Sequence, residues 1–151
     1  MKQNNIEKTS LRTLAQRLHS ADRCDERILH EVINSACSRL QNTRARSSFD
    51  QKVRSGAWID AVISLIALEL PAWTLRRIVR DDGLWVCTLS RHPELPIERD
   101  DAAEAFHRDL PLAILMSFVE ARLAMKHKTV RVATQRTHSQ WQYVMGCENF
   151  T

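Results

Sequence analysis

Two short segments of alternating apolar residues, 73–80 and 84–90, constrain the fold of this chain more than any other feature. The turn between them, Asp81-Asp82-Gly83, contains Asp-Gly, which is the strongest short-range signal for a β-hairpin because glycine tolerates positive φ. One face of this hairpin is largely apolar, so we expect the hairpin to be half-buried. Arg77 interrupts that face, which otherwise consists of Trp73, Leu75, Val79, Trp85, Cys87 and Leu89.

An apolar helix is predicted on each side of the hairpin. The first covers residues 57–70, with Ser55 as its N-cap and Pro71 at its end. It is apolar almost all round, so we expect it to be buried on most sides. The second covers residues 110–125 and is capped by Asp109. Because a lone hairpin is only marginally stable, these segments predict a helix-rich α+β fold, with helices packed on a small antiparallel sheet.

Periodicity and composition assign the other segments. Helices at 10–20 and 23–40 form an antiparallel pair, and Asp22 caps the second. Residues 41–54 are polar and basic with few apolar anchors, so we interpret them as a linker or long loop. A short helical turn is expected over residues 100–105, which follow a loop containing two prolines.

The length of 151 residues fits one domain. We divide it into an N-terminal helical pair and basic linker (1–54), a helix–hairpin–helix core (55–125) and a basic tail (126–151). The apolar pattern decays in the tail, so we expect the tail to be mobile. Its residues 129–135, or a second copy of the chain, are candidates to extend the sheet, because a two-stranded sheet has two open edges.

The net charge of +4 is unevenly placed. Residues 122–151 hold five basic residues against Glu148 alone, which equals the whole net charge, so the basic character belongs to the tail. The N-terminus has no apolar segment typical of a signal peptide, and the longest apolar run is far short of the roughly 18 residues of a membrane span. We therefore expect a soluble cytoplasmic protein that does not contact membranes.

The residue types typical of catalytic and metal sites have simpler interpretations here. Four cysteines occur without a CxxC pair, so neither a metal site nor a disulfide framework is predicted. Cys37 and Cys87 fit buried thiols, and Cys87 shares the apolar hairpin face although His92 and His107 are near in sequence. Turns and helix caps explain the acidic pairs, and the histidines show no ligand spacing. We predict no catalytic, cofactor-binding or metal-binding residue.

Asp60 stands out because it lies on an otherwise apolar helix. A buried carboxylate needs a partner, and Arg76 or Arg77 on the following strand could provide one. We assign the predicted buried ion pair to Asp60 and Arg77.

Several packing positions resemble a known family. An Asp-Arg pair before an apolar helix, a tryptophan on a buried helix, tryptophan-containing strands and a Leu-Pro-Leu-Ala-Ile helix together resemble phage-related ABA-sandwich-like domains of bacterial and prophage hypothetical proteins. The resemblance covers about residues 14–124 and implies a fold and a mobile-element origin, without an activity. The chain departs from it in a longer N-terminal region and in two basic segments. The matching positions are Asp22-Arg23, Trp58, Asp60, Ala61, Trp73, Trp85, Cys87, Leu89 and Leu110-Pro111-Leu112-Ala113-Ile114.

Two functions follow as hypotheses. The four tryptophans and the open sheet edges favour a non-enzymatic accessory or regulatory protein that acts through protein contacts, with an unidentified partner or as a homodimer. The alternative is a nucleic-acid-associated regulator, because cations attract phosphate and aromatic rings stack on bases. The residues assigned to partner or nucleic-acid contact are Arg44, Arg46, Lys126, Lys128, Arg131, Arg136 and Trp141.

Overall fold

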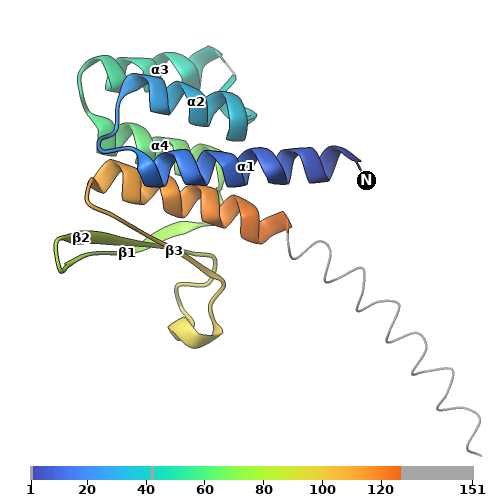
Figure 1. The fold of residues 1–151 in the computed structure, drawn as a ribbon, viewed down its shortest axis with the longest axis vertical. Coiled ribbons are helices and arrows are strands. Elements are labelled where there is room, and N and C mark those ends of the chain that lie inside the picture. The colour runs from blue at the N-terminus through green and yellow to red at the C-terminus, as the bar shows by residue number, and fades with distance from the viewer. Residues whose placement is uncertain (1, 42, 127–151) are drawn as a thin grey trace, which may run out of the picture.

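The computed structural model describes residues 2–41 and 43–126 and confirms the helix-rich α+β fold (Figure 1). A helix that begins at residue 110 continues to the last described residue, 126. We call it the 110–126 helix. The other elements are α1 (Lys2–Ser20), α2 (Glu26–Ala36), the 3₁₀ turn η1 (Arg39–Gln41), α3 (Thr43–Arg54), α4 (Trp58–Glu69), β1 (Thr74–Asp81), β2 (Leu84–Ser90), the 3₁₀ turn η2 (Ile97–Arg99) and β3 (Ala102–His107).

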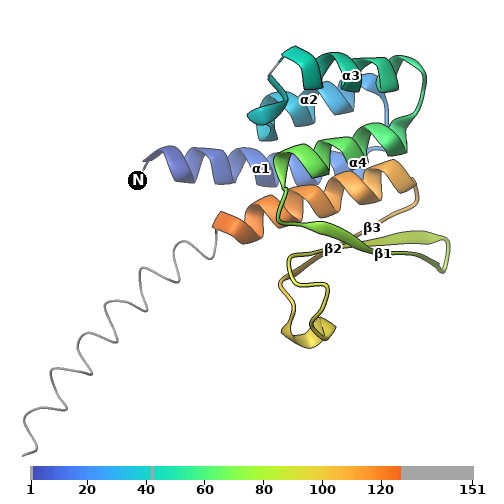
Figure 2. The same cartoon turned by 180° about the vertical axis from the view of Figure 1, so that it is seen from behind.

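The helices lie on one face of the sheet. Figures 1 and 2 show the 110–126 helix next to the sheet, α1 and α4 beyond the 110–126 helix, and α2 and α3 on the far side. The core between these layers includes Cys87 and Leu89 from the sheet and Phe118 from the 110–126 helix, all fully buried. We call the sheet face under the helices the inner face and the opposite one the outer face.

The predicted hairpin is confirmed. β1 and β2 pair antiparallel, and Asp81 lies opposite Leu84 at the end of the ladder. The two loop residues, Asp82 and Gly83, have φ of 47° and 80°. Two consecutive positive φ values are what a two-residue type I′ turn requires, because its twist matches that of the strands.

The third strand comes from a segment where the sequence suggested a helical turn. β3 pairs antiparallel with β2 along the side away from β1, so the strand order is β1-β2-β3. Buried and exposed residues alternate along β3, with Ala103, Ala105 and His107 buried. The expected helical turn after Asp100 is therefore wrong. Residues 129–135, the other candidate strand, lie outside the described residues.

A bulge in β1 changes which residues share a face. The register shifts between Leu75 and Arg77, so Ile78 lies opposite Cys87 and Val79 lies opposite Val86. Because opposed residues in an antiparallel pair share a face, Ile78 is on the inner face and Val79 on the outer face. The predicted apolar face is correct on β2 but wrong on β1 beyond the bulge, since one inserted residue reverses the alternation.

Residues 41–54 are not a linker. Residues 43–54 form α3, and residues 39–41 form the turn before it. Phe49 and Val53, spaced i and i+4, are buried in the core, and Ala45 packs against it one turn earlier. This spacing places all three on one helical face, so a single apolar stripe is enough to dock an otherwise polar helix.

Helix starts differ from the predicted ones in three places. α1 begins at Lys2, not at residue 10. The N-cap of α2 is Asp25 instead of Asp22, and its carboxylate accepts a hydrogen bond from Ile28 N at 2.8 Å. α4 begins after Ala57, which makes no side-chain cap bond, rather than after a Ser55 cap. Asp109 does cap the 110–126 helix, as predicted, and accepts from Leu112 N at 3.4 Å.

Candidate functional site

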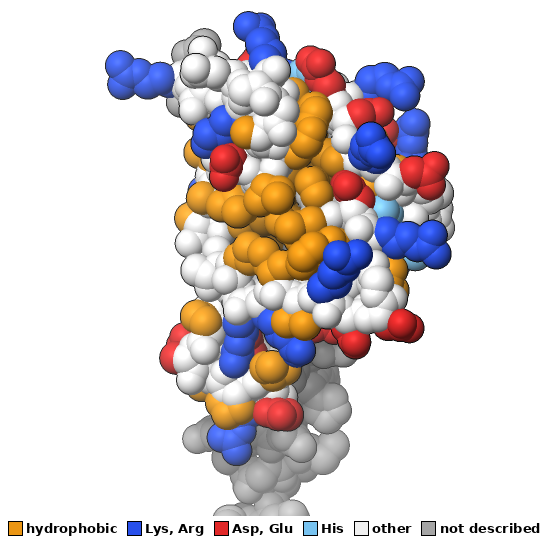
Figure 3. Space-filling view, turned by 90° about the vertical axis from the view of Figure 1, so that its left-hand side faces the viewer, with side chains coloured by type: hydrophobic (Ala, Val, Ile, Leu, Met, Phe, Trp, Pro, Cys, Tyr) orange, Lys and Arg blue, Asp and Glu red, His pale blue; other side chains and the backbone are white. Residues whose placement is uncertain are grey.

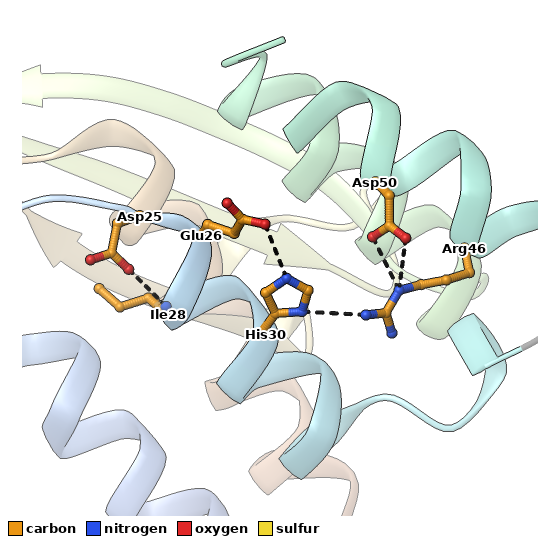
Figure 4. A network of polar contacts seen from close by, with 6 residues as sticks. All are labelled: Asp25, Glu26, Ile28, His30, Arg46 and Asp50. Atoms are coloured by element: carbon orange, nitrogen blue, oxygen red, sulfur yellow. Dashed lines mark hydrogen bonds and ion pairs between the residues drawn. The ribbon is translucent and has the colours of Figure 1, made fainter. Parts of the chain in front are cut away.

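The predicted contact residues Arg44 and Arg46 both lie on α3, but they differ in their surroundings. Arg46 Nε is 3.1 Å from an Asp50 carboxylate oxygen, and its Nη2 is 3.3 Å from Nδ1 of His30 on α2 (Figure 4). His30 Nε2 is in turn 3.4 Å from Glu26. Arg46 therefore belongs to a polar network that joins α2 to α3. Arg44 is exposed and lines a surface hollow with Ser38 and Arg39.

Lys126 also has a partner within the fold. Its ammonium group pairs with the Glu7 carboxylate of α1, and this hydrogen bond and charge hold the pKa of Glu7 below its ordinary value. The pair joins the 110–126 helix to α1. The remaining predicted contact residues, which are Lys128, Arg131, Arg136 and Trp141, lie outside the described residues.

The predicted ion pair between Asp60 and Arg77 is wrong. Both side chains are exposed. Arg77 lies opposite Thr88, on the outer face, whereas the helices, including α4, lie on the side of the inner face. Asp60 needs no buried partner, because it lies in the first turn of α4, where water and the helix dipole both favour a carboxylate.

The buried ion pair of β1 is formed by Arg76 and Asp100. Arg76 Nη1 is 2.7 Å from Asp100, whose side chain is 0% exposed. The same carboxylate accepts hydrogen bonds from the Ser90 hydroxyl and, at 3.0 Å, from His92 N. Burial alone would raise the pKa of Asp100, but these bonds and the Arg76 charge together lower it. The cluster fastens residues 91–101 to the outer face of the sheet.

The sequence analysis also missed Glu69, the other charged residue of α4. Its side chain is buried, and its carboxylate accepts three backbone hydrogen bonds from residues before α3. The distances are 2.8 Å from Arg39 N, 2.8 Å from Leu40 N and 3.3 Å from Ser38 N. Glu69 thus satisfies the free N–H groups of η1. The argument used for Asp60, that a carboxylate on an apolar helix needs partners, applies to Glu69 instead.

The thiols are confirmed as core residues. Burial raises the pKa of Cys24 and Cys37 to about 12 and that of Cys87 to about 11. A thiolate is the reactive form of cysteine, and burial disfavours its formation at these side chains. His107 is bonded elsewhere: Asp109 N donates to Nδ1 at 2.9 Å, which leaves Nε2–H to donate to Ala21 O at 2.9 Å.

The described residues present neither a cluster of metal-ligating side chains nor a helix suited to span a membrane. Within residues 2–41 and 43–126, no group of three or more His, Cys, Asp or Glu side chains is placed to hold a metal ion. The helices of the same described part include none that is both long and apolar enough to cross a membrane.

One end of the molecule carries exposed apolar side chains. α4 was predicted to be buried on most sides, but Ile59 and Ile63 are 39% and 41% exposed. Ala67 is also exposed and continues their i, i+4 spacing along the helix. We call these three residues the α4 ridge. Ile78, on the inner face of the adjacent β1, is 38% exposed.

Two tryptophans are also incompletely buried. Trp58 at the start of α4 and Trp85 on β2 are half-buried, and the Arg80 guanidinium lies 5.5 Å from the centre of the Trp85 ring. Figure 3 views the end of the molecule with the hairpin turn and the starts of α4 and the 110–126 helix, and hydrophobic side chains gather across its middle. We call the α4 ridge together with Ile78, Trp58 and Trp85 the apolar end surface.

No protein-family model, curated protein or solved structure matches this chain. The function must therefore be argued from the geometry alone.

Proposed function

We propose that this protein is a non-enzymatic accessory protein that binds another protein, and that its apolar end surface receives an amphipathic helix of that partner. The observation that carries the proposal is the α4 ridge, where two isoleucines of the most apolar helix are about two-fifths exposed. A helix that is apolar all round is normally covered on all sides. A binding partner would supply the cover that the described residues leave open.

The size of the surface favours a single helix as the occupant. Side chains exposed to this degree offer roughly a few hundred Å² of apolar surface. A stable interface between two domains buries about 800 Å² on each partner. The apolar end surface is therefore too small for a permanent dimer on its own and fits one short element.

The arrangement of the side chains also suits a helix. Ile59, Ile63 and Ala67 form an i, i+4, i+8 row, the kind of ridge that packs into the groove of another helix. Ala67, at one end of the row, has a small side chain that allows close approach. Trp58 adjoins Ile59 at the start of the row, and Arg80 and Trp85 lie in contact on the hairpin. Trp and Arg are the residue types most often found at binding hot spots.

The thiols support two other parts of the proposal, which are the cytoplasmic location and the absence of an enzymatic activity. Cys24, Cys37 and Cys87 are free as well as buried, as in proteins of reducing compartments, and we propose the cytoplasm as the site of action. Their raised pKa values disfavour nucleophilic chemistry at these thiols. The mobile-element origin implied by the family resemblance remains a proposal.

The test compares matched variants. Ile59→Glu/Ile63→Glu places charges on the α4 ridge, and Ile97→Glu alters an isoleucine that is also exposed but lies in η2. Proteins captured from the native host by the wild-type chain are identified, and peptides covering their amphipathic helices are titrated by calorimetry. We expect a peptide that binds the wild type and Ile97→Glu but loses at least about tenfold in affinity with the double variant. Equal binding to all three proteins would overturn the proposal.

A nucleic-acid-associated regulator is the second candidate function. Arg39 and Arg44 favour it, because both are exposed and line the same hollow. Retention of DNA or RNA that falls steeply with salt, and that is weakened by Arg39→Ser/Arg44→Ser or by deletion of residues 126–151, would support it. Retention that does not depend on salt would exclude it.

A further inference from the structure

The two edges of the sheet are built differently. β1 is interrupted by its bulge and carries Arg76, Arg77 and Arg80, which are features that discourage another strand from pairing. β3 pairs with β2 without interruption from Ala102 to His107 and contains no proline, lysine or arginine. Among the described residues no strand pairs with its other side. β3 is therefore the edge that can accept a further strand.

An apolar row on the outer face ends at this edge. Val79 lies opposite Val86, and Val86 lies opposite Phe106. Phe106 is 50% exposed, although it is the largest member of the row. A neighbouring strand with an apolar residue opposite Phe106 would continue the row and cover the ring, and cross-strand aromatic pairs stabilise a sheet.

Opposite charges flank Phe106 at equal spacing. Glu104 precedes it by two residues on the outer face of β3, and Arg108 follows it by two in the bend directly after the strand. Both charged side chains are exposed. Glu104 also accepts a hydrogen bond from Thr88 at 2.9 Å, which holds its carboxylate over the sheet. In an antiparallel pair of two β3 strands centred on Phe106, Glu104 of each copy comes level with Arg108 of the other, which lies just beyond the end of its strand.

We propose that two copies of this chain associate through β3, antiparallel and centred on Phe106, to form one six-stranded sheet. A two-fold axis perpendicular to the sheet relates the copies, so the pair of Glu104 and Arg108 occurs twice. The row then runs through both copies as Val79, Val86, Phe106, Phe106, Val86 and Val79. A pairing centred on Glu104 would oppose two like charges, and one centred on Ala105 would place Glu104 opposite Phe106, so both are disfavoured.

Charge reversal tests the register. Glu104→Arg and Arg108→Glu each create two like-charged pairs, whereas the double variant restores opposite charges in exchanged positions. Sedimentation across a concentration series should show a wild-type dimer, weakened at least about tenfold by each single change and recovered in the double variant. Circular dichroism checks that each variant folds. A monomeric wild type, or a dimer equally weakened in the double variant, would overturn the proposal.

A crosslink tests the geometry independently. Phe106→Cys in a Cys147→Ser background places two cysteines across the two-fold axis, at a separation that a disulfide spans. Ala102→Cys is the matched control, because it lies on the same face of the same strand but beyond the overlap. Mild oxidation should crosslink the first variant and leave the second without a crosslink. Equal crosslinking of both, or a dimer abolished by Ile59→Glu/Ile63→Glu but not by Arg108→Glu, would exclude the β3 interface.

Discussion

A single carboxylate organises the polar part of the outer sheet face. Asp100 receives Arg76, Ser90 and the backbone of His92, although its side chain has no contact with solvent. A buried carboxylate is costly unless its oxygens are occupied by donors, and here three donors from two segments occupy them. Residues 91–101 are therefore part of the packed structure rather than a free loop.

We expect Asp100→Asn to lower the free energy of unfolding by about 2 kcal/mol at pH 7, because the amide nitrogen cannot accept from Arg76 and one buried donor is left unpaired. Asp82→Asn is the control, since Asp82 is exposed and has a positive φ that asparagine tolerates. Urea unfolding measures both. Equal stabilities of the two variants would contradict the assignment of Asp100 as the anchor.

The difference between wild type and Asp100→Asn should also depend on pH. The pKa of Asp100 is lowered in the folded state, so its contribution to stability is complete above its ordinary pKa of about 3.9. The contribution is lost as pH falls through the lowered folded value. The difference in the free energy of unfolding should be constant from about pH 7 to pH 5 and shrink below about pH 4.

The sequence could not identify this pair because of one inserted residue. Regular alternation assigns Arg77 to the inner face and pairs it with Asp60. The bulge moves Arg77 to the outer face. A bulge leaves no reliable trace in a single sequence, since neither Leu75 nor Arg76 is a glycine.

At the scale of elements, α3 shows how little apolar surface a docked helix needs. Its buried residues are Phe49 and Val53, and Lys52 reaches the hydroxyl of Ser64 on α4. Most of its residues are polar or charged, which is why composition suggested a linker. The sequence signal for a docked helix is the i, i+4 spacing of Phe49 and Val53 rather than the number of apolar residues.

Phe49→Ala should therefore destabilise the whole domain by about 3 kcal/mol, because it removes a ring that is 2% exposed and leaves a cavity. Ser47→Ala changes an exposed position of the same helix and should alter stability by less than about 0.5 kcal/mol. Urea unfolding followed by far-ultraviolet circular dichroism compares the two. An unchanged midpoint for Phe49→Ala would show that α3 is not part of the cooperative unit.

The hairpin and the 110–126 helix were predictable because local signals and tertiary packing agree. Asp82-Gly83 determines the turn, and Asp109 determines the helix start. In β3 the local helix propensity and the tertiary packing conflict. Three of its six residues are alanine, the best helix former, and only pairing with β2 makes the segment a strand. Exposure of the α4 ridge was not predictable either, since a sequence does not indicate which side of an apolar helix remains uncovered.

At the scale of the whole molecule, one corner joins two segments that lie far apart in the described chain. His107 donates to Ala21 O, and Asp109 accepts from Cys24 N at 3.0 Å, so the corner after β3 holds the loop between α1 and α2. These contacts span 85 and 86 residues of sequence. The first and last parts of the described chain therefore belong to one folding unit.

Substitutions of two N-cap aspartates distinguish the effect of helix capping from that of the hydrogen bond between Asp109 and Cys24 N. Asp25→Ala removes the cap of α2 and should cost about 1 kcal/mol. Asp109→Ala removes a cap and also the acceptor of Cys24 N, so it should cost about 2 kcal/mol. Thermal unfolding followed by tryptophan fluorescence and by circular dichroism should stay coincident in both variants. If Asp109→Ala lowers the free energy of unfolding no more than Asp25→Ala does, the bond to Cys24 N does not stabilise this corner.

The buried carboxylate of Glu69 imposes an order of events on folding. The N–H groups of Ser38, Arg39 and Leu40 are satisfied by a side chain located 29 to 31 residues later in the chain. During synthesis these groups leave the ribosome well before α4 is available. The N–H groups between α2 and α3 therefore stay hydrated until α4 has formed. Docking of α4 then supplies both the apolar surface and the Glu69 carboxylate that accepts from them.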